Sequence, residues 1–190
     1  MKKQEGMAVY VLLLRGVNVG GAGRLPMADL GALLAGLGCE DVQTYSQSGN
    51  AVFRSAREAG ELTEAIADGI AAGFGFRPAV LLREAGEVAA VLAANPFAQG
   101  AEKPRSVHVY FLTSAAREAD LARLRALAAP DEDIQLTDTA FYLFAPSIGR
   151  SALAAKLERL LGVPATARNL RTVAALAGMA RALGAEEARC

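Results

Sequence analysis

The chain has 190 residues, 53% of them hydrophobic and 21% charged, and its formal net charge at pH 7 is zero. This balance is typical of a globular protein with a buried core and excludes a disordered chain. Zero net charge excludes a bulk field that would draw the protein to nucleic acid or to an anionic membrane, so any anion site must be local. Cys39 and Cys190 form no redox or metal-ligand motif, and no apolar run is long enough to span a bilayer. These features predict a reduced, cytoplasmic protein without a membrane partner.

The first half of the chain predicts the element order β-α-β-β-α-β. An unbroken apolar run at 9–14 indicates a strand that is covered on both faces. Pro26 can open a helix at its first turn, and Gly38 can end it. In chain order we expect a strand at 9–14, a helix at 26–37, strands at 42–46 and 50–55, a helix at 62–74 and a strand at 79–83.

This order is the split βαβ arrangement of a ferredoxin-like unit, and its topology brings two polar segments together. The first and second strands run parallel through a right-handed crossover, with the third strand antiparallel between them. The loop at 15–26 and the turn at 46–50 therefore lie at the same end of the predicted sheet. The segment 75–78, which contains Arg77, reaches that end as well.

The second half repeats most of this order. A short helix is expected at 86–94, and the glycine and proline in 99–105 are typical of a linker. We therefore predict an N-terminal domain at 1–98 and a C-terminal domain at 99–190. Its expected elements are a strand at 107–113, a helix at 118–127 with Leu121, Leu124 and Leu127 inward, strands at 134–137 and 140–145, and a helix at 151–161.

The predicted fold class is α/β of the α+β type, with two ferredoxin-like βαββα(β) halves and helices packed on antiparallel or mixed sheets. Where the second half would add its fourth strand, residues 164–172 are expected to run instead into an extra C-terminal helix. The missing strand would leave an exposed edge in the second half. One alternative for function is therefore a homo-oligomer or another protein interaction through that edge strand.

The glycine-rich loop after the first strand is compatible with phosphate binding, because glycines expose backbone N–H groups and a following helix start favours anions. The P-loop glycine spacing is present, but Ala22 and Gly23 replace the lysine and the serine or threonine that hold phosphates and magnesium. Two interpretations stay open. Either the loop is a tight connection in which Arg15 and Asn18 satisfy backbone groups, or it holds a small anionic or polar ligand.

The candidate ligand site combines this loop with the polar turn. Its predicted residues are Arg15, Asn18, Gly20, Gly21, Ser46, Gln47, Ser48 and Asn50. Arg168 and Arg171 are three residues apart at a predicted helix start, a spacing that can place both guanidinium groups on one face to clamp a carboxylate or phosphate. Thr166 or Asn169 would cap that helix. Arg168, Asn169 and Arg171 are the candidate second wall, with a capped surface helix as the alternative.

The sequence contains no group of residues that can be identified as a catalytic centre. His108 is the only histidine, and its alternation with inward residues of a strand predicts an outward or interface position. No zinc site, Ser-His-Asp triad, nucleophile–base pair or cofactor follows from the residues, although an enzyme is not excluded. Nucleic-acid binding through exposed Tyr10 and Phe53 is a further alternative, which the neutral charge and the doubly apolar first strand oppose.

Four segments carry a resemblance to a known family. They are the motifs at 13–21, 25–27, 45–53 and 166–173, and the resemblance extends over nearly the whole chain. In this order they resemble the bacterial family called domain of unknown function 1697. The resemblance implies a soluble bacterial protein with an α/β fold related to a ferredoxin-like duplication, and shared motif membership links the second wall to the first. Leu170 stands where that family commonly has an aromatic residue, usually tryptophan.

Overall fold

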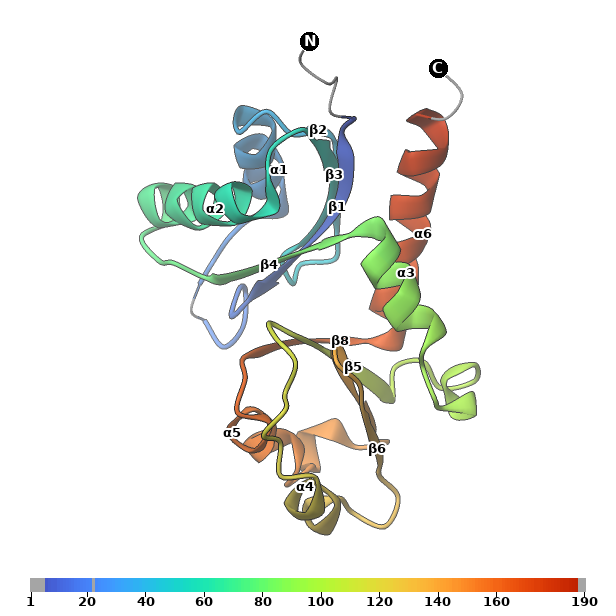
Figure 1. The fold of residues 1–190 in the computed structure, drawn as a ribbon. Coiled ribbons are helices and arrows are strands. Elements are labelled where there is room, and N and C mark those ends of the chain that lie inside the picture. The colour runs from blue at the N-terminus through green and yellow to red at the C-terminus, as the bar shows by residue number, and fades with distance from the viewer. Residues whose placement is uncertain (1–5, 22, 188–190) are drawn as a thin grey trace. The chain divides into compact units, whose positions relative to one another are not determined.

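The computed structural model describes residues 6–21 and 23–187, and its ribbon is shown in Figure 1. Contacts divide the chain into two compact units. The first consists of the described parts of Met1–Ala89 and Leu176–Cys190, and the second of Ala90–Ala175. Each unit contains one four-stranded sheet of its described strands, which confirms the predicted fold class. The domain division at 98/99 stays a prediction.

The first unit has the predicted element order and the predicted sheet. Its elements are β1 (Ala8–Arg15), α1 (Met27–Gly36), β2 (Glu40–Tyr45), β3 (Asn50–Ser55), α2 (Ala59–Phe74) and β4 (Ala79–Glu84). The strand order is β2-β3-β1-β4, and all neighbours are antiparallel. Leu12 pairs with Ala51 of β3 on one side and with Leu82 of β4 on the other. β2 therefore runs parallel to β1 with β3 between them, as the topology predicts.

The central strand β1 is buried on both faces, which explains its unbroken apolar run. Leu12 and Leu14 belong to the core beneath α1 and α2. Val11 and Leu13 alternate with them and are fully buried on the opposite face. That face is covered by the part of α6 (Leu170–Glu187) that belongs to this unit, as Figure 1 shows. The α6 residues buried here recur at helical spacing: Leu176, Ala180 and Leu183.

The second unit begins within α3 (Ala85–Ala93) and repeats the same topology. Its remaining elements are β5 (Val107–Leu112), α4 (Leu121–Leu127), β6 (Asp133–Leu136), β7 (Ala140–Phe144), α5 (Leu157–Leu161) and β8 (Ala165–Asn169), with short 3₁₀ turns at Ala98–Gly100, Ile148–Arg150 and Ala154–Lys156. The strand order is β6-β7-β5-β8. The core beneath α4 and α5 contains Leu124, Phe141 and Leu157.

Strand β8 corrects the prediction that the second half lacks its fourth strand. β8 pairs antiparallel with β5, and Ala167 lies opposite Tyr110. The sequence of this strand is short and carries alanines and an arginine, so it has little strand propensity of its own. Residues 165–169 therefore form a strand because they pair with the strongly apolar β5, and their own strand propensity contributes little. The edge expected beside β5 is therefore occupied, and the sheet ends at β6 and β8.

The two helices of the second unit are shorter than predicted. α4 begins at Leu121 because Asp120 is its N-cap and accepts a hydrogen bond from the Arg123 N–H at 2.9 Å. The predicted helix at 151–161 is α-helical only from Leu157 onward, after a 3₁₀ turn at Ala154–Lys156. Before it, the Ser151 hydroxyl accepts from the Ala154 N–H at 3.0 Å and stabilises a local turn.

Candidate functional site

The β1–α1 loop and the β2–β3 turn meet at one end of the first sheet. The Asn18 side chain donates from Nδ2 to the main-chain oxygen of Gln47 at 2.7 Å. The Leu14 N–H, at the end of β1, donates to the Gly49 carbonyl at 2.8 Å. These two bonds confirm that topology brings the two polar segments together. We call the surface formed by residues 15–21, 23–26 and 46–50 the rim.

Asn18 holds the rim together with its whole side-chain amide. Besides its bond to Gln47, Nδ2 donates to the Leu25 carbonyl at 2.8 Å, and Oδ1 accepts from the Leu25 N–H at 2.9 Å. Both amide hydrogens and the oxygen are thus used within the protein. The backbone of Asn18 has a φ of 55°, a left-handed conformation that asparagine tolerates better than most residues. Its role in the structure is therefore to fix the loop, as the structural interpretation of the loop predicted.

Two glycines allow the close packing of the rim. At Gly49, which has a φ of 72°, a Cβ atom would lie 2.7 Å from the Leu14 Cβ. At Gly23 a Cβ atom would lie 2.5 Å from the Gly16 carbonyl oxygen and 3.2 Å from Phe76 Cε2. The second contact also confirms that the segment before β4 reaches this end of the sheet. By contrast, the predicted site residues Gly20 and Gly21 are exposed, with nothing within 4 Å of such an atom.

The β2–β3 turn divides into a buried support and an exposed tip. Asn50 is fully buried and donates from Nδ2 to the Tyr45 carbonyl and to the Ser48 hydroxyl, both at 3.1 Å. Ser46 and Gln47 are exposed, and Ser46 has a left-handed φ of 60°. Asn50 and Ser48 therefore shape the turn, while Ser46 and Gln47 are presented to solvent.

The charge of the rim is positive. Its described residues include Arg15 and Arg24, both exposed, and no aspartate or glutamate. Arg77, which topology brings to the same end, forms ion pairs with Glu64 at 2.6 Å and with Asp68, both on α2. The rim therefore attracts anions more than cations.

The residues of the predicted second wall belong to the second unit and to two different elements. Arg168 and Asn169 end β8, whereas Arg171 lies in the first turn of α6. The interpretation of Arg168 and Arg171 as a pair on one helical face is therefore wrong, because β8 takes Arg168 into the sheet. That this wall reaches the rim stays a prediction.

Two of these residues have local structural roles. Asn169 caps α6 by accepting from the Thr172 N–H at 2.9 Å, so it is the cap residue of the two that were considered. Arg168 donates from Nη1 to the Ala167 carbonyl at 2.7 Å, and burial lowers the pKa of its guanidinium to about 10. Leu170 is buried, and a Cβ atom at Gly100 would lie 2.7 Å from its Cδ2. Leucine thus fills a core position where the resembling family commonly has tryptophan.

The structure also bears on the other functions that were considered, namely RNA binding, metal binding and membrane insertion. Tyr10 and Phe53 are buried in the core beneath α1 and α2, so they are not the exposed stacking rings that RNA binding would need. Among residues 6–21 and 23–187, no group of three or more metal-ligating side chains comes together. Over the same described part, no helix has the length and apolar character needed to cross a membrane.

His108 lies half-buried in β5, opposite Leu143 and Asn169. Its Nε2 atom is buried and has no hydrogen-bond partner among the described residues. Burial lowers the pKa of this imidazole below its usual value.

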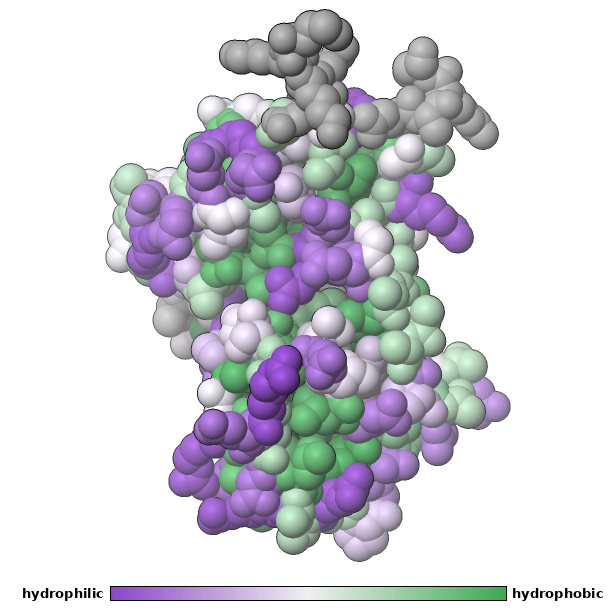
Figure 2. Space-filling model, viewed as in Figure 1, coloured by the Kyte–Doolittle hydropathy of each residue, from purple (hydrophilic) through white to green (hydrophobic). Residues whose placement is uncertain are grey.

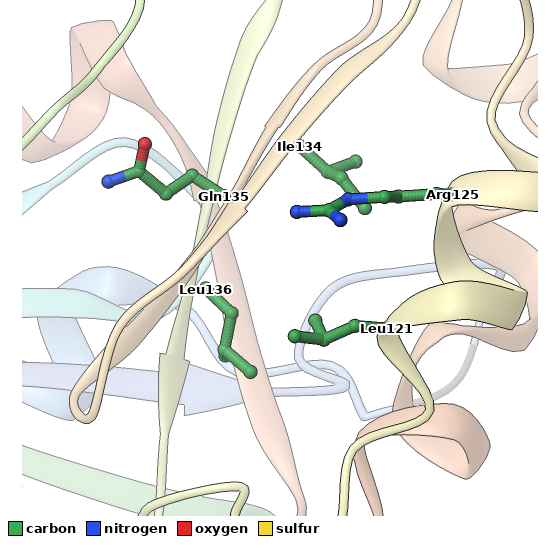
Figure 3. A pocket seen from close by; sticks show the side chains of 5 residues that line it. All are labelled: Leu121, Arg125, Ile134, Gln135 and Leu136. Carbon is green, nitrogen blue, oxygen red and sulfur yellow. The ribbon is translucent and has the colours of Figure 1, made fainter.

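A groove between α4 and β6 was not expected from the sequence. It has a volume of about 300 Å³ and is lined by Leu121, Arg125, Ile134, Gln135 and Leu136, shown in Figure 3. Leu121 was predicted to face inward, but 38% of its surface is exposed. The helical spacing in the sequence does not predict this exposure of Leu121, because it carries no information on how far the neighbouring strand β6 extends. In Figure 2, hydrophobic surface bordered by hydrophilic side chains lies between the places that α4 and β6 occupy in Figure 1.

Comparisons with known proteins now identify the family. The chain is similar to a solved structure described as the conserved bacterial protein SP0830 from Streptococcus pneumoniae, with 29% identity and a TM-score of 0.67. The match covers 92% of this chain and 99% of that one. No curated protein matches the chain. The family model described as a protein of unknown function, DUF1697, matches residues 7–142. The chain therefore belongs to the DUF1697 family.

Proposed function

We propose that the protein binds a small anionic or polar ligand at the rim. The observation that carries this proposal is the bond from Asn18 to Gln47, which joins two exposed segments far apart in the sequence. A rim held in one shape before binding loses little conformational entropy when a ligand arrives, which favours affinity. Asn18 and Asn50 are the supports in this proposal and do not contact the ligand.

The ligand-facing groups are the exposed members of the rim. Arg15 and Arg24 supply positive charge, and Ser46 and Gln47 supply polar side chains from the turn. Gly20 and Gly21 are exposed and add main-chain N–H groups of the kind that bind anions. The absence of carboxylates among the described rim residues favours a phosphate or carboxylate over a cation.

Titration calorimetry with inorganic phosphate and with citrate tests this function. We expect Arg15→Ala and Arg24→Ala each to weaken binding by about tenfold, because a hydrogen bond to a charged group contributes roughly 1.5 kcal/mol. The matched control is Arg117→Ala, which removes an exposed arginine of the second unit. If neither anion binds, or if all three variants bind equally well, the rim is not an anion site.

A further inference from the structure

We propose that the groove between α4 and β6 docks an extended peptide segment of another protein, which adds as a strand to β6 and places an acidic side chain beside Arg125. This site lies in the second unit and is independent of the anion site at the rim. Its supports are an open sheet edge, an exposed apolar side chain and a cation, which coincide at this one groove.

The open edge of β6 defines the main-chain chemistry of the occupant. β6 is the last strand of its sheet and pairs only with β7 among the described strands. The Thr137 N–H donates to the Ala140 carbonyl at 2.9 Å, which fixes the phase of the β6–β7 ladder. Because hydrogen-bonded pairs alternate in an antiparallel ladder, the main-chain groups of Ile134 and Leu136 point away from β7. An added strand is the partner that matches such an edge.

A hydrogen bond within β6 determines which of these main-chain groups remain available to an added strand. The Ile134 N–H is taken by the Asp133 carboxylate at 2.8 Å, which partly protects the edge against indiscriminate pairing. The Ile134 carbonyl and both main-chain groups of Leu136 point outward from the open edge of the sheet. The docking edge is therefore short, and side-chain contacts have to supply part of the affinity and the specificity.

The groove offers an apolar contact next to a charged one. Figure 3 shows Leu121 and Leu136 pointing toward one another across the groove, with the Arg125 guanidinium extending over it near Ile134. The Gln135 side chain points to the other face of the strand. An occupant thus meets an apolar position at Leu121 and Leu136, followed by a cationic position at Arg125.

The spacing of these positions matches an extended chain. Leu121 and Arg125 are one helical turn apart, which corresponds to about 6 Å along the helix axis. In a strand, side chains on the same face are two residues apart, or about 6.7 Å. A segment with an apolar residue and an acidic residue separated by one position therefore fits both contacts.

Charge distinguishes this partner from a second copy of the chain. The groove-side residues of β6 are Ile134 and Leu136, so a second β6 brings no carboxylate on that face to meet Arg125. Glu132 and Asp133 line an adjoining hollow together with Arg125, and each of these carboxylates accepts a local main-chain N–H, from Ala129 at 3.0 Å and from Ile134 at 2.8 Å. Among the described residues, Arg125 is the only charged one that lines the groove itself, so an acidic side chain in a separate segment is the charge complementary to this lining.

Fluorescence anisotropy with designed peptides tests the proposal. The probe is a short, end-capped, labelled peptide in which threonine alternates with leucine, aspartate and leucine. One control peptide has lysine in place of aspartate, and another is N-methylated at alternate residues so that it cannot pair with an edge. We expect the aspartate peptide to bind more tightly than the lysine peptide and the N-methylated peptide not to bind, with amide chemical-shift changes concentrated at 134–136.

Charge reversal provides the decisive variant. Arg125→Glu is expected to weaken the aspartate peptide by about fivefold, as for an exposed ion pair, and to strengthen binding of the lysine peptide. The matched control is Arg123→Glu, which changes an exposed arginine of the same helix that does not line the groove. Thermal melts show whether each variant is folded.

Four outcomes overturn the proposal: no peptide binds the folded parent protein, the N-methylated peptide binds equally well, Arg123→Glu has the same effect as Arg125→Glu, or sedimentation shows a dimer whose formation shifts the amide signals of β6.

Discussion

The two units have the same strand order, but their first helices cover the sheets to different extents. α1 (Met27–Gly36) begins with Met27, which is only 8% exposed, whereas α4 (Leu121–Leu127) begins with Leu121, which is 38% exposed. The second helices differ even more in length, with 16 residues in α2 and 5 in α5. Topology is thus shared, but the first unit presents a polar rim formed by its loops, while the start of α4 in the second unit leaves an apolar side chain exposed beside β6.

The largest expected effect tests this difference directly. Met27→Ala should lower the free energy of unfolding by about 3 kcal/mol, because it removes a buried side chain and leaves a cavity. Leu121→Ala is the matched change at the first position of α4 and should cost less than about 1 kcal/mol. Urea denaturation measures both. Equal losses would show that the two helices cover their sheets equally.

The packing of the rim predicts the next effect. Gly49→Ala should cost about 2 to 3 kcal/mol, since the new Cβ meets the Leu14 Cβ and the backbone is left-handed. Gly20→Ala has the same backbone strain without the clash and should cost about 1 kcal/mol. The difference between the two variants in urea denaturation isolates the close approach of turn and strand. No difference would contradict it.

Asn18→Ala should cost about 1 to 2 kcal/mol because the Leu25 and Gln47 main-chain groups lose their shared partner. Asn18→Gly keeps the left-handed backbone accessible and separates loss of the amide from backbone strain. Amide hydrogen exchange of the loop and the turn should increase in both variants. Unchanged exchange in the turn would indicate that the bond to Gln47 does not hold the rim.

The smallest expected effect is a pH dependence from the second unit. Burial lowers the pKa of His108 in the folded protein below 6.5, so the unfolded chain binds the proton more readily. The contribution of His108 to stability is therefore fully present above pH 6.5 and decreases as pH falls toward the lower folded pKa. The difference between parent and His108→Leu in unfolding free energy between pH 5 and 7 measures it. A parent and a variant with the same pH slope would contradict this assignment.

Much of the fold was predictable because hydrophobic pattern and turn residues agree along the first unit. β3 has its predicted bounds, and topology alone brought Asn18 and Gln47 to the same end of the sheet. β8 was missed because its residues carry no strand pattern, and its pairing with β5 depends on residues more than fifty positions earlier. Local sequence cannot contain that information.

The sequence predicted the position of the candidate site better than the chemical roles of its residues. Residue type identified Asn18 and Asn50 as polar candidates, but not that internal hydrogen bonds use the Asn18 amide and hold Asn50 in the turn. Arg24, which shares the positive rim, was passed over because no motif contains it. The groove at Leu121 depends on the lengths of α4 and β6, which capping and pairing set in three dimensions.

The chain leaves the first unit at Ala89 and returns to it at Leu176. The face of β1 that contains Val11 and Leu13 is therefore covered by a helix that is synthesised only after the whole second unit. During translation this apolar face is exposed until α6 has been made, and transiently exposed apolar surface of this kind favours aggregation. A C-terminal truncation that removes α6 turns that transient exposure into a permanent one.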